Sequence, residues 1–188
     1  MNIVIYGSGS VHVSLLPAYI QVLHRRLEVD ISIVLSTAAH RFVSGEALCT
    51  LTARPVHGPI DDVGPLGIPR HVELAEWADL VLVLPATANT LAKLANGFSC
   101  DLGAAVVLAA SCPVVVAPAM RRSMYEKAAV RRNLATLEAD GARVLRPGAY
   151  PAVGQRAGGA DLGDEGMSPS PSQVLEFIEP LCEQRAAS

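Results

Sequence analysis

The sequence has few aromatic and few charged residues, and its charges form no block of one sign. Aromatic residues make up 4% of the 188 residues and charged residues 18%, and the net charge is −3. A protein that binds nucleic acid or an anionic membrane usually carries a basic patch or stripe. We therefore expect neither partner, and the abundant small aliphatic residues favour closely packed α/β layers.

Cysteine motifs, targeting segments and membrane spans are also missing. The four cysteines are widely spaced, without a CxxC pair or metal-ligand spacing, which favours reduced thiols, a cytoplasmic protein and no metal site. No basic segment precedes the strand-like residues 2–6, so no signal peptide is expected. The longest uncharged run, residues 102–120, is broken by Pro113 and Pro118, which argues against a transmembrane helix.

What the sequence does contain is a regular alternation of strands and helices over a length that suits one domain, residues 1–188. Apolar runs predict strands at 3–6, 31–35, 80–84, 113–116 and 142–145, with a short further strand near 51–53. Helices are expected over 11–23, 69–77, 88–96, 101–110, 126–139 and 172–185. A further helix is expected to begin at residues 36–39 and to include Ala47 and Leu48. Residues 147–171 read as a long, mobile or functional loop. This alternation predicts a three-layer, doubly wound α/β fold around a parallel sheet.

The stretch from Asp79 to Gly97 is the most informative segment. Leu80 to Leu84 is a continuous apolar run typical of a strand buried on both faces, and we expect Pro85 to end it. Thr87 to Thr90 then begin a helix with short side chains and free backbone N–H groups, a place suited to an anion. Gly97 is expected to close that helix. An ordinary capped helix would explain the same pattern.

Three more polar turns follow predicted strands. They are Gly7-Ser8-Gly9-Ser10, Ser36-Thr37 and residues 117–125. Because the carboxyl ends of parallel strands meet at one edge of the sheet, where ligands bind in such folds, we expect these turns to form one site. The first turn is not a complete GxGxxG dinucleotide motif, because His12 occupies the position of the last glycine.

His71 is a candidate base. It lies near the start of the helix 69–77, on the same face as Leu74 and Ala75. A helix that precedes a central strand starts near the carboxyl edge, so we expect His71 close to the candidate site, where a helix N-terminus favours the neutral ring. A core histidine held by hydrogen bonds is the competing interpretation.

Two motifs resemble those of the homo-oligomeric flavin-containing cysteine decarboxylases. Pro85-Ala-Thr-Ala-Asn-Thr90 is similar to the family's Pro-Ala-Ser-Ala-Asn-Thr motif, and the continuation to Gly97 also fits. Pro118-Ala-Met120 with Met124 and Tyr125 is similar to its second motif, Pro-x-Met-Asn-x-x-Met-Trp, and His71 matches its active-site histidine. The resemblance covers about residues 1–145.

The resemblance implies a flavodoxin-like (Rossmann-like) protomer that binds FMN between subunits of a homotrimer, with a dodecamer as the larger assembly. His71 would be the catalytic base, and Arg121, Met124 and Tyr125 would contact the substrate. The residues expected to hold FMN are Gly7, Ser8, Gly9, Ser10, Ser36, Thr37, Phe42, Pro85, Ala86, Thr87, Ala88, Asn89, Thr90, Ala119 and Met120.

The implied reaction is the oxidative decarboxylation of a C-terminal cysteine to an enethiol, in which FMN takes up the two hydrogens. Two residues depart from the family pattern: Arg121 replaces an asparagine and Tyr125 replaces a tryptophan. We expect Arg121 to bind the substrate carboxylate as a charge-assisted pair. A solvated surface arginine is the alternative.

Two features favour a peptide ending in cysteine, as in lantibiotic-type pathways that make aminovinyl-cysteine, over 4′-phosphopantothenoylcysteine. The loop 147–171 reads Ala157-Gly-Gly-Ala-Asp161 and lacks the Ala-Cys-Gly flap usual in enzymes for the latter substrate, and no synthetase domain is fused to the sequence. Phosphopantothenoylcysteine decarboxylation in coenzyme A biosynthesis stays open as the alternative. A non-catalytic flavin-binding regulatory or interaction protein and a flavin prenyltransferase are further readings, the last disfavoured by His71 and the Met120–Met124 motif.

Overall fold

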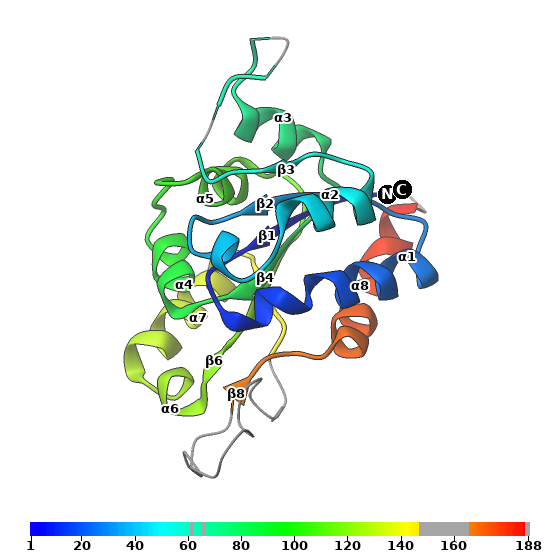
Figure 1. Cartoon of the computed structure of the whole chain (residues 1–188). Helices are drawn as coiled ribbons and strands as arrows, with labels where there is room; N and C mark the ends of the chain where they lie inside the picture. Colours follow the sequence, from blue (N-terminus) through cyan, green and yellow to red (C-terminus); the bar gives the residue numbers. More distant parts are fainter. Residues whose placement is uncertain (61, 65–66, 147–165, 187–188) are drawn as a thin grey trace.

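The computed structural model describes residues 1–60, 62–64, 67–146 and 166–186, and its centre is a parallel sheet between two helical layers (Figure 1). The sheet has six strands in the order β3-β2-β1-β4-β5-β7, all parallel to their neighbours. The strands are β1 (Asn2–Gly7), β2 (Asp30–Leu35), β3 (Val56–His57), β4 (Leu80–Ala86), β5 (Val114–Pro118) and β7 (Arg143–Val144). The three-layer, doubly wound, flavodoxin-like fold is thereby confirmed.

Each face of the sheet packs against its own set of helices because side chains alternate along the strands. In β1, Ile3 and Ile5 join the core on the face covered by α1 (Leu16–Arg26), α2 (Gly45–Thr52) and α8 (Pro171–Ala186). Val4 and Tyr6 join the core on the opposite face, which is covered by α3 (Arg70–Trp77), α4 (Ala88–Ala95), α5 (Leu102–Ala109) and α7 (Ala128–Ala139). The connections change face between β1 and β4, which is where ligands bind in such sheets.

Several predicted elements are divided or displaced. The helix expected over 11–23 is a 3₁₀ turn, η1 (Val11–Leu15), followed by α1, whose first turn contains Pro17. After β2 the chain makes a second 3₁₀ turn, η2 (Ala39–Arg41), before Ser44 caps α2 by accepting a hydrogen bond from Ala47 N. The strand predicted near 51–53 is wrong: these residues end α2, where Ala53 adopts a left-handed conformation with φ of 53°.

The segment from Asp79 to Gly97 forms a strand, a turn and a helix, as predicted, with one difference at Pro85. β4 continues through Pro85 to Ala86, so the expectation that Pro85 ends the strand is wrong. The register between β4 and β5 is irregular there, which accommodates a residue without an N–H group. Thr87 caps α4, and Gly97, with φ of +67°, lies just beyond its end. The C′ glycine is therefore confirmed.

The second motif forms its own small elements. Residues 120–121 make β6 (Met120–Arg121), which pairs antiparallel with β8 (Gly166–Met167), and α6 (Arg122–Tyr125) precedes α7. The predicted helix 126–139 is thus α7, with its start displaced by the separate turn α6. Most of the predicted loop 147–171, including 157–161, lies outside the described residues, and the predicted C-terminal helix is α8. Within the described ranges, no helix is both long and apolar enough to cross a membrane.

Candidate functional site

A cavity of about 490 Å³ lies at the carboxyl edge of the sheet, where the chain leaves β1 and β4 towards opposite faces. Its size falls in the usual range of about 300–1,000 Å³ for small-molecule sites. Its lining comes from the end of β1, from the turns after β1, β2 and β4, from α4 and α6, and from the residue that caps α5. These residues are Tyr6, Ser8, Gly9, Ser36, Thr37, Ala38, Thr87, Ala88, Asn89, Thr90, Lys93, Asp101 and Met124. The polar turns that the sequence predicted at one edge do meet there.

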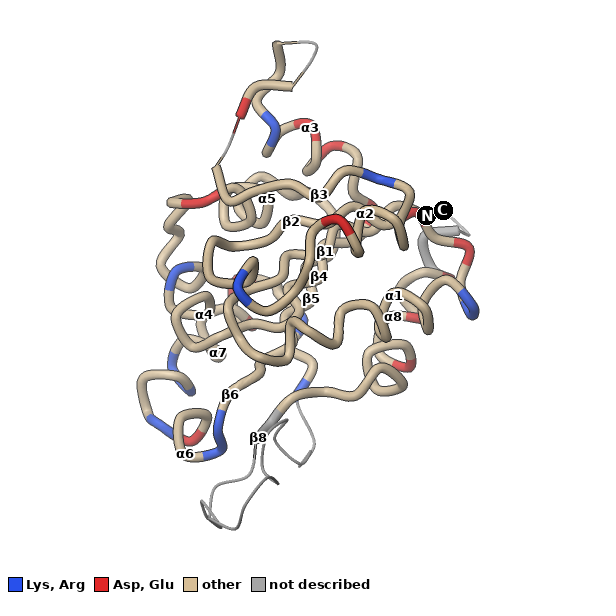
Figure 2. Tube along the Cα trace, in the orientation of Figure 1, with Lys and Arg blue, Asp and Glu red and all other residues tan. Residues whose placement is uncertain are grey.

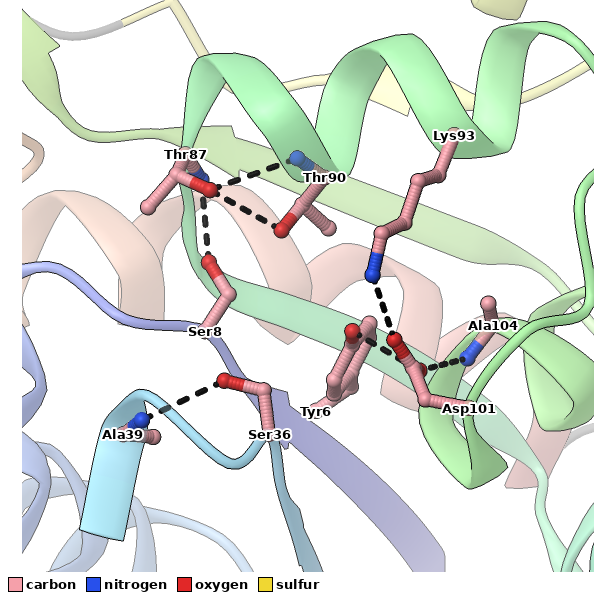
Figure 3. Close-up of polar contacts among 9 residues, drawn as sticks. All are labelled: Tyr6, Ser8, Ser36, Ala39, Thr87, Thr90, Lys93, Asp101 and Ala104. Atoms are coloured by element: carbon pink, nitrogen blue, oxygen red, sulfur yellow. Dashed lines mark hydrogen bonds and ion pairs between the residues drawn. The ribbon is translucent and has the colours of Figure 1, made fainter. Parts of the chain in front are cut away.

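The turns after β1 and β4 are joined by one buried hydroxyl. Ser8 Oγ donates to Pro85 O at 2.6 Å. The same oxygen accepts from Thr87 N at 3.0 Å (Figure 3). The turns after β1 and β2 also approach closely, because a Cβ built on Gly9 would lie 2.3 Å from Cβ of Ala38. Gly9 therefore has to be glycine for these two turns to meet.

The start of α4 is arranged to receive an anion. Thr87 Oγ1 accepts from Thr90 N at 3.3 Å and lies 3.0 Å from Thr90 Oγ1, while Asn89 is exposed beside them. A helix N-terminus carries a partial positive charge and unpaired N–H groups, which bind phosphate in many nucleotide sites. This end of the cavity is thus suited to a phosphate group.

A charged junction between α4 and α5 forms another part of the cavity wall, and sequence reasoning missed it as part of the site. Asp101 Oδ1 accepts from Tyr6 Oη at 2.9 Å and from Ala104 N at 3.0 Å, and Asp101 Oδ2 pairs with Lys93 Nζ at 2.7 Å (Figure 3). The sequence signalled only that Asp101 begins a helix. Two further signals could have pointed to this junction. They are the hydroxyl of Tyr6 near the end of a buried strand and the charge of Lys93 in an otherwise uncharged helix.

The pKa values at this junction follow from its contacts. Burial, followed by the charge of Asp101, raises the pKa of Tyr6 far above its ordinary value, so the phenol stays protonated. Burial alone would raise the pKa of the Asp101 carboxyl, but hydrogen bonds from Lys93, Ala104 N and Tyr6 outweigh it and hold that pKa below its usual value. The hydrogen bond to Asp101 raises the pKa of Lys93.

The structure brings together nine of the residues that the sequence predicted for the site. Those that line the cavity are Ser8, Gly9, Ser36, Thr37, Thr87, Ala88, Asn89, Thr90 and Met124. Those that do not line it are Gly7, Ser10, Phe42, Pro85, Ala86, Ala119, Met120, Arg121, Tyr125 and His71.

The residues outside the lining have identifiable positions. Gly7, Pro85, Ala86, Ala119 and Met120 are buried. The side chain of Ser10 caps η1, Phe42 follows η2 on the surface, and Tyr125 packs against the core beneath α7. Arg121 is exposed in β6, three residues before Met124.

His71, the predicted base, does not line this cavity within one chain. It lies, half-buried, in the first turn of α3, a helix that packs beside α5 and follows β3 at the edge of the sheet. The helix does start at the carboxyl edge, but the cavity lies over β1 and β4, towards the middle of the sheet. Within one chain, the described structure therefore does not place His71 in the cavity wall.

The cavity fits the FMN that the sequence analysis expected. The Gly9–Ala38 approach and the start of α4 make a narrow polar cradle for a phosphate, with the hydroxyls of Ser36 and Thr37 beside it. Met124, which is exposed, adds an apolar side chain against which a flat ring system can pack.

Comparisons with known proteins agree with these features. The Flavoprotein family model matches residues 1–182. The Coenzyme A biosynthesis bifunctional protein CoaBC of Vibrio vulnificus (strain YJ016) is 37% identical over 167 residues, which cover 86% of this chain and 39% of that protein. The chain thus spans about two fifths of the length of this curated relative.

Two solved structures are similar over most of the chain. The FMN-dependent cysteine decarboxylase SpaF has a TM-score of 0.81 and 31% identity, covering 99% of this chain and 97% of that one. The FMN-dependent cysteine decarboxylase TvaF from thioviridamide biosynthesis has a TM-score of 0.69 and 36% identity, covering 77% of this chain and 88% of that one.

Proposed function

Because this chain belongs to the Flavoprotein family, we propose that it is an FMN-dependent enzyme that oxidatively decarboxylates the C-terminal cysteine of a peptide. The broader class, an FMN-dependent decarboxylase, rests on the family match and on the similarity to SpaF and TvaF over most of the chain. The similarity to two cysteine decarboxylases supports a substrate that ends in cysteine, and the absence of an Ala-Cys-Gly segment from residues 147–171 favours a peptide over phosphopantothenoylcysteine.

One observation carries the proposal: the two motifs meet at one cavity. The turn Thr87–Thr90, from the first motif, lines one wall, and Met124, from the second motif, lines the same cavity although the two are separated by α5 and β5. Tyr6, Ser8 and Ser36 complete the wall from neighbouring strands. A cofactor held at the first motif would therefore lie beside the segment that carries Arg121.

The chemistry requires few protein groups. The cysteine unit –NH–CH(COO⁻)–CH₂–SH loses two hydrogens to give a thioaldehyde; its carboxylate then leaves as CO₂, because the remaining carbanion delocalises onto sulfur, and protonation gives the enethiol –NH–CH=CH–SH. FMN, when bound, accepts the two electrons of the oxidation. The protein has to bind the carboxylate, orient the thiol and remove a proton.

Arg121 is the residue that we assign to the substrate carboxylate. Its guanidinium pairs with no acidic group in the described ranges, and Figure 2 shows basic residues concentrated around β6 and α6. Its neighbour Arg122, by contrast, is held by Glu126 at 2.8 Å. Tyr125 packs against the core and would support α6, and Met124 would contact the substrate at the cavity mouth.

His71 reaches the cavity in our proposal from a second copy of the chain. α5 is apolar on all sides, as buried helices are, yet Leu108 is 62% exposed and Phe98, just before α5, is 60% exposed. They border an apolar groove of about 310 Å³ between α4, α5 and α7, and α3 lies next to α5. A homo-oligomer, with a trimer as its unit, would cover this surface and bring His71 of one copy near the cavity of another.

The competing substrate is phosphopantothenoylcysteine, which the 37% identity to CoaBC favours. Purified protein loaded with FMN is incubated separately with peptides ending in cysteine and with phosphopantothenoylcysteine, and the products are identified by mass. We expect the peptides to lose one CO₂ and two hydrogens, with a higher kcat/KM than that for phosphopantothenoylcysteine. Turnover of phosphopantothenoylcysteine alone would assign the enzyme to coenzyme A biosynthesis. Bound FMN without turnover of either compound would indicate a non-catalytic flavin protein.

A further inference from the structure

Tyr6 differs from the rest of β1 because it ends a buried strand with a polar group. The side chain is 1% exposed, and its ring fills the space beside Gly103 of α5, where a built Cβ would lie 2.2 Å from the ring. The same residue lines the cavity. The ring thus fixes the distance between β1 and α5 at the point where the cofactor would bind.

The hydroxyl of Tyr6 joins three elements through one carboxylate. It donates to Asp101 Oδ1 at 2.9 Å, while Asp101 also caps α5 through Ala104 N and pairs with Lys93 of α4 at 2.7 Å (Figure 3). The side chains of Asp101 and Lys93 are 12% and 27% exposed, so this pair is only weakly screened by water. Removing one member would leave the others partly buried with an unpaired polar group.

The polar wall continues to the start of α4. Thr90 is 3% exposed, also lines the cavity, and its Oγ1 lies 3.0 Å from Thr87 Oγ1. Thr87 N in turn donates to Ser8 Oγ. Because Lys93 and Thr90 lie on the same helix, α4 connects the ion pair to the turn that faces the phosphate end of the cavity.

We propose that Tyr6 is a positioning residue for FMN: through Asp101, which pairs with Lys93 of α4 and caps α5, its hydroxyl holds α4 and α5 at the separation that fits the cofactor. Because its pKa is raised, the phenol remains a hydrogen-bond donor throughout the neutral and mildly alkaline range. This inference rests on the FMN part of the proposed function and makes no assumption about the substrate.

The test is the FMN affinity of Tyr6→Phe, which removes the hydroxyl and keeps the ring. Tyr19→Phe is the matched control, because Tyr19 is also buried and donates its hydroxyl to Pro169 O, but on the opposite face of the sheet. Apoprotein is titrated with FMN by fluorescence at a temperature where circular dichroism shows each variant folded, and the absorption spectrum of the bound flavin is recorded. We expect Tyr6→Phe to raise the Kd about 3- to 10-fold and to shift the spectrum. Tyr19→Phe should do neither.

A second pair keeps the inference testable if Tyr6→Phe folds poorly. Lys93→Met breaks the ion pair from the α4 side and should also weaken FMN binding, whereas Arg146→Met breaks an equally short pair, with Glu138 at 2.7 Å, away from the cavity. A wild-type Kd in Tyr6→Phe and Lys93→Met, or equal weakening in the controls, would overturn the inference. FMN binding without decarboxylation would contradict the proposed function and leave this inference standing.

Discussion

At the scale of single residues, Arg121 is the clearest departure from the motif that the second segment resembles. It is exposed in β6, and the next residue, Arg122, is also an arginine but is held by Glu126. An arginine can bind a carboxylate through two parallel hydrogen bonds, but the charge that it binds disappears when CO₂ leaves. Its contribution should therefore appear in substrate binding more than in the chemical step.

Arg121→Ala should raise KM for a peptide ending in cysteine and lower kcat/KM about 10- to 100-fold, the effect of losing a hydrogen bond to a charged group. Arg122→Ala is the matched control and should change kcat/KM less than about threefold, because it removes an exposed ion pair with Glu126. Steady-state kinetics on the two variants tests whether Arg121 binds the substrate carboxylate. Equal kinetics for Arg121→Ala and the wild type would identify Arg121 as a solvated surface residue.

Some site residues could be predicted from a local sequence pattern, whereas others belong to the site only through contacts between distant parts of the chain. Ser8, Ser36 and Thr87 directly follow strands, so a local pattern places them at the edge of the sheet. Tyr6 and Asp101 are 95 residues apart, and only the packing of α5 on β1 brings them together. No local pattern predicts such a contact.

At the scale of elements, the junction between α4 and α5 has a defined dependence on pH. The folded-state pKa of Asp101 lies below its unfolded value, so at acid pH the unfolded chain binds more protons than the folded one. The stabilisation from the ionised carboxylate is therefore present above about pH 4, the ordinary value for Asp, and is lost as the pH falls through the lowered pKa.

Asp101→Asn should destabilise the protein by about 1–3 kcal/mol at pH 7, because Lys93 loses its charged partner. Denaturant unfolding at pH 7 and at pH 3 checks the sign: the difference between the variant and the wild type should shrink at the lower pH. A difference that is the same at both values would mean that the ionised carboxylate contributes nothing to stability.

The elements themselves could be predicted where the pattern was strong and local. The buried runs of β1, β2 and β4 and the caps Thr87, Asp101 and Gly97 were recognised because each carries its own signal. The 3₁₀ turns η1 and η2 and the strand β8 were not, since they depend on how the chain packs or on a partner strand far along the sequence. The two-residue β3 is too short for a period to be read.

At the scale of the whole molecule, His71 does not line the cavity within one chain, so a catalytic role for it requires a second copy. The sequence analysis expected His71 near the site from the order of elements and from the family resemblance. Within one chain, α3 packs beside α5, and His71 lies outside the lining of the cavity. If a second copy supplies His71, each active site is composite, and two defective chains can complement each other.

Mixing His71→Asn chains with Arg121→Ala chains should restore activity. Neither variant alone has a complete site in this account, but a mixed oligomer contains sites with His71 from one chain and Arg121 from the other. The two proteins are unfolded together, refolded and assayed, with each refolded alone as the control. Activity no greater than the sum of the controls would contradict a site shared between copies.

The measurement that tests the central claim most directly is an anaerobic single turnover with a peptide ending in cysteine, followed in the flavin absorption and by peptide mass. The account predicts that the oxidised flavin band bleaches at the same rate as the peptide loses one CO₂ and two hydrogens, with one product formed per flavin. A peptide that stays intact, or that changes without bleaching of the flavin, would contradict an FMN-dependent oxidative decarboxylation at this cavity.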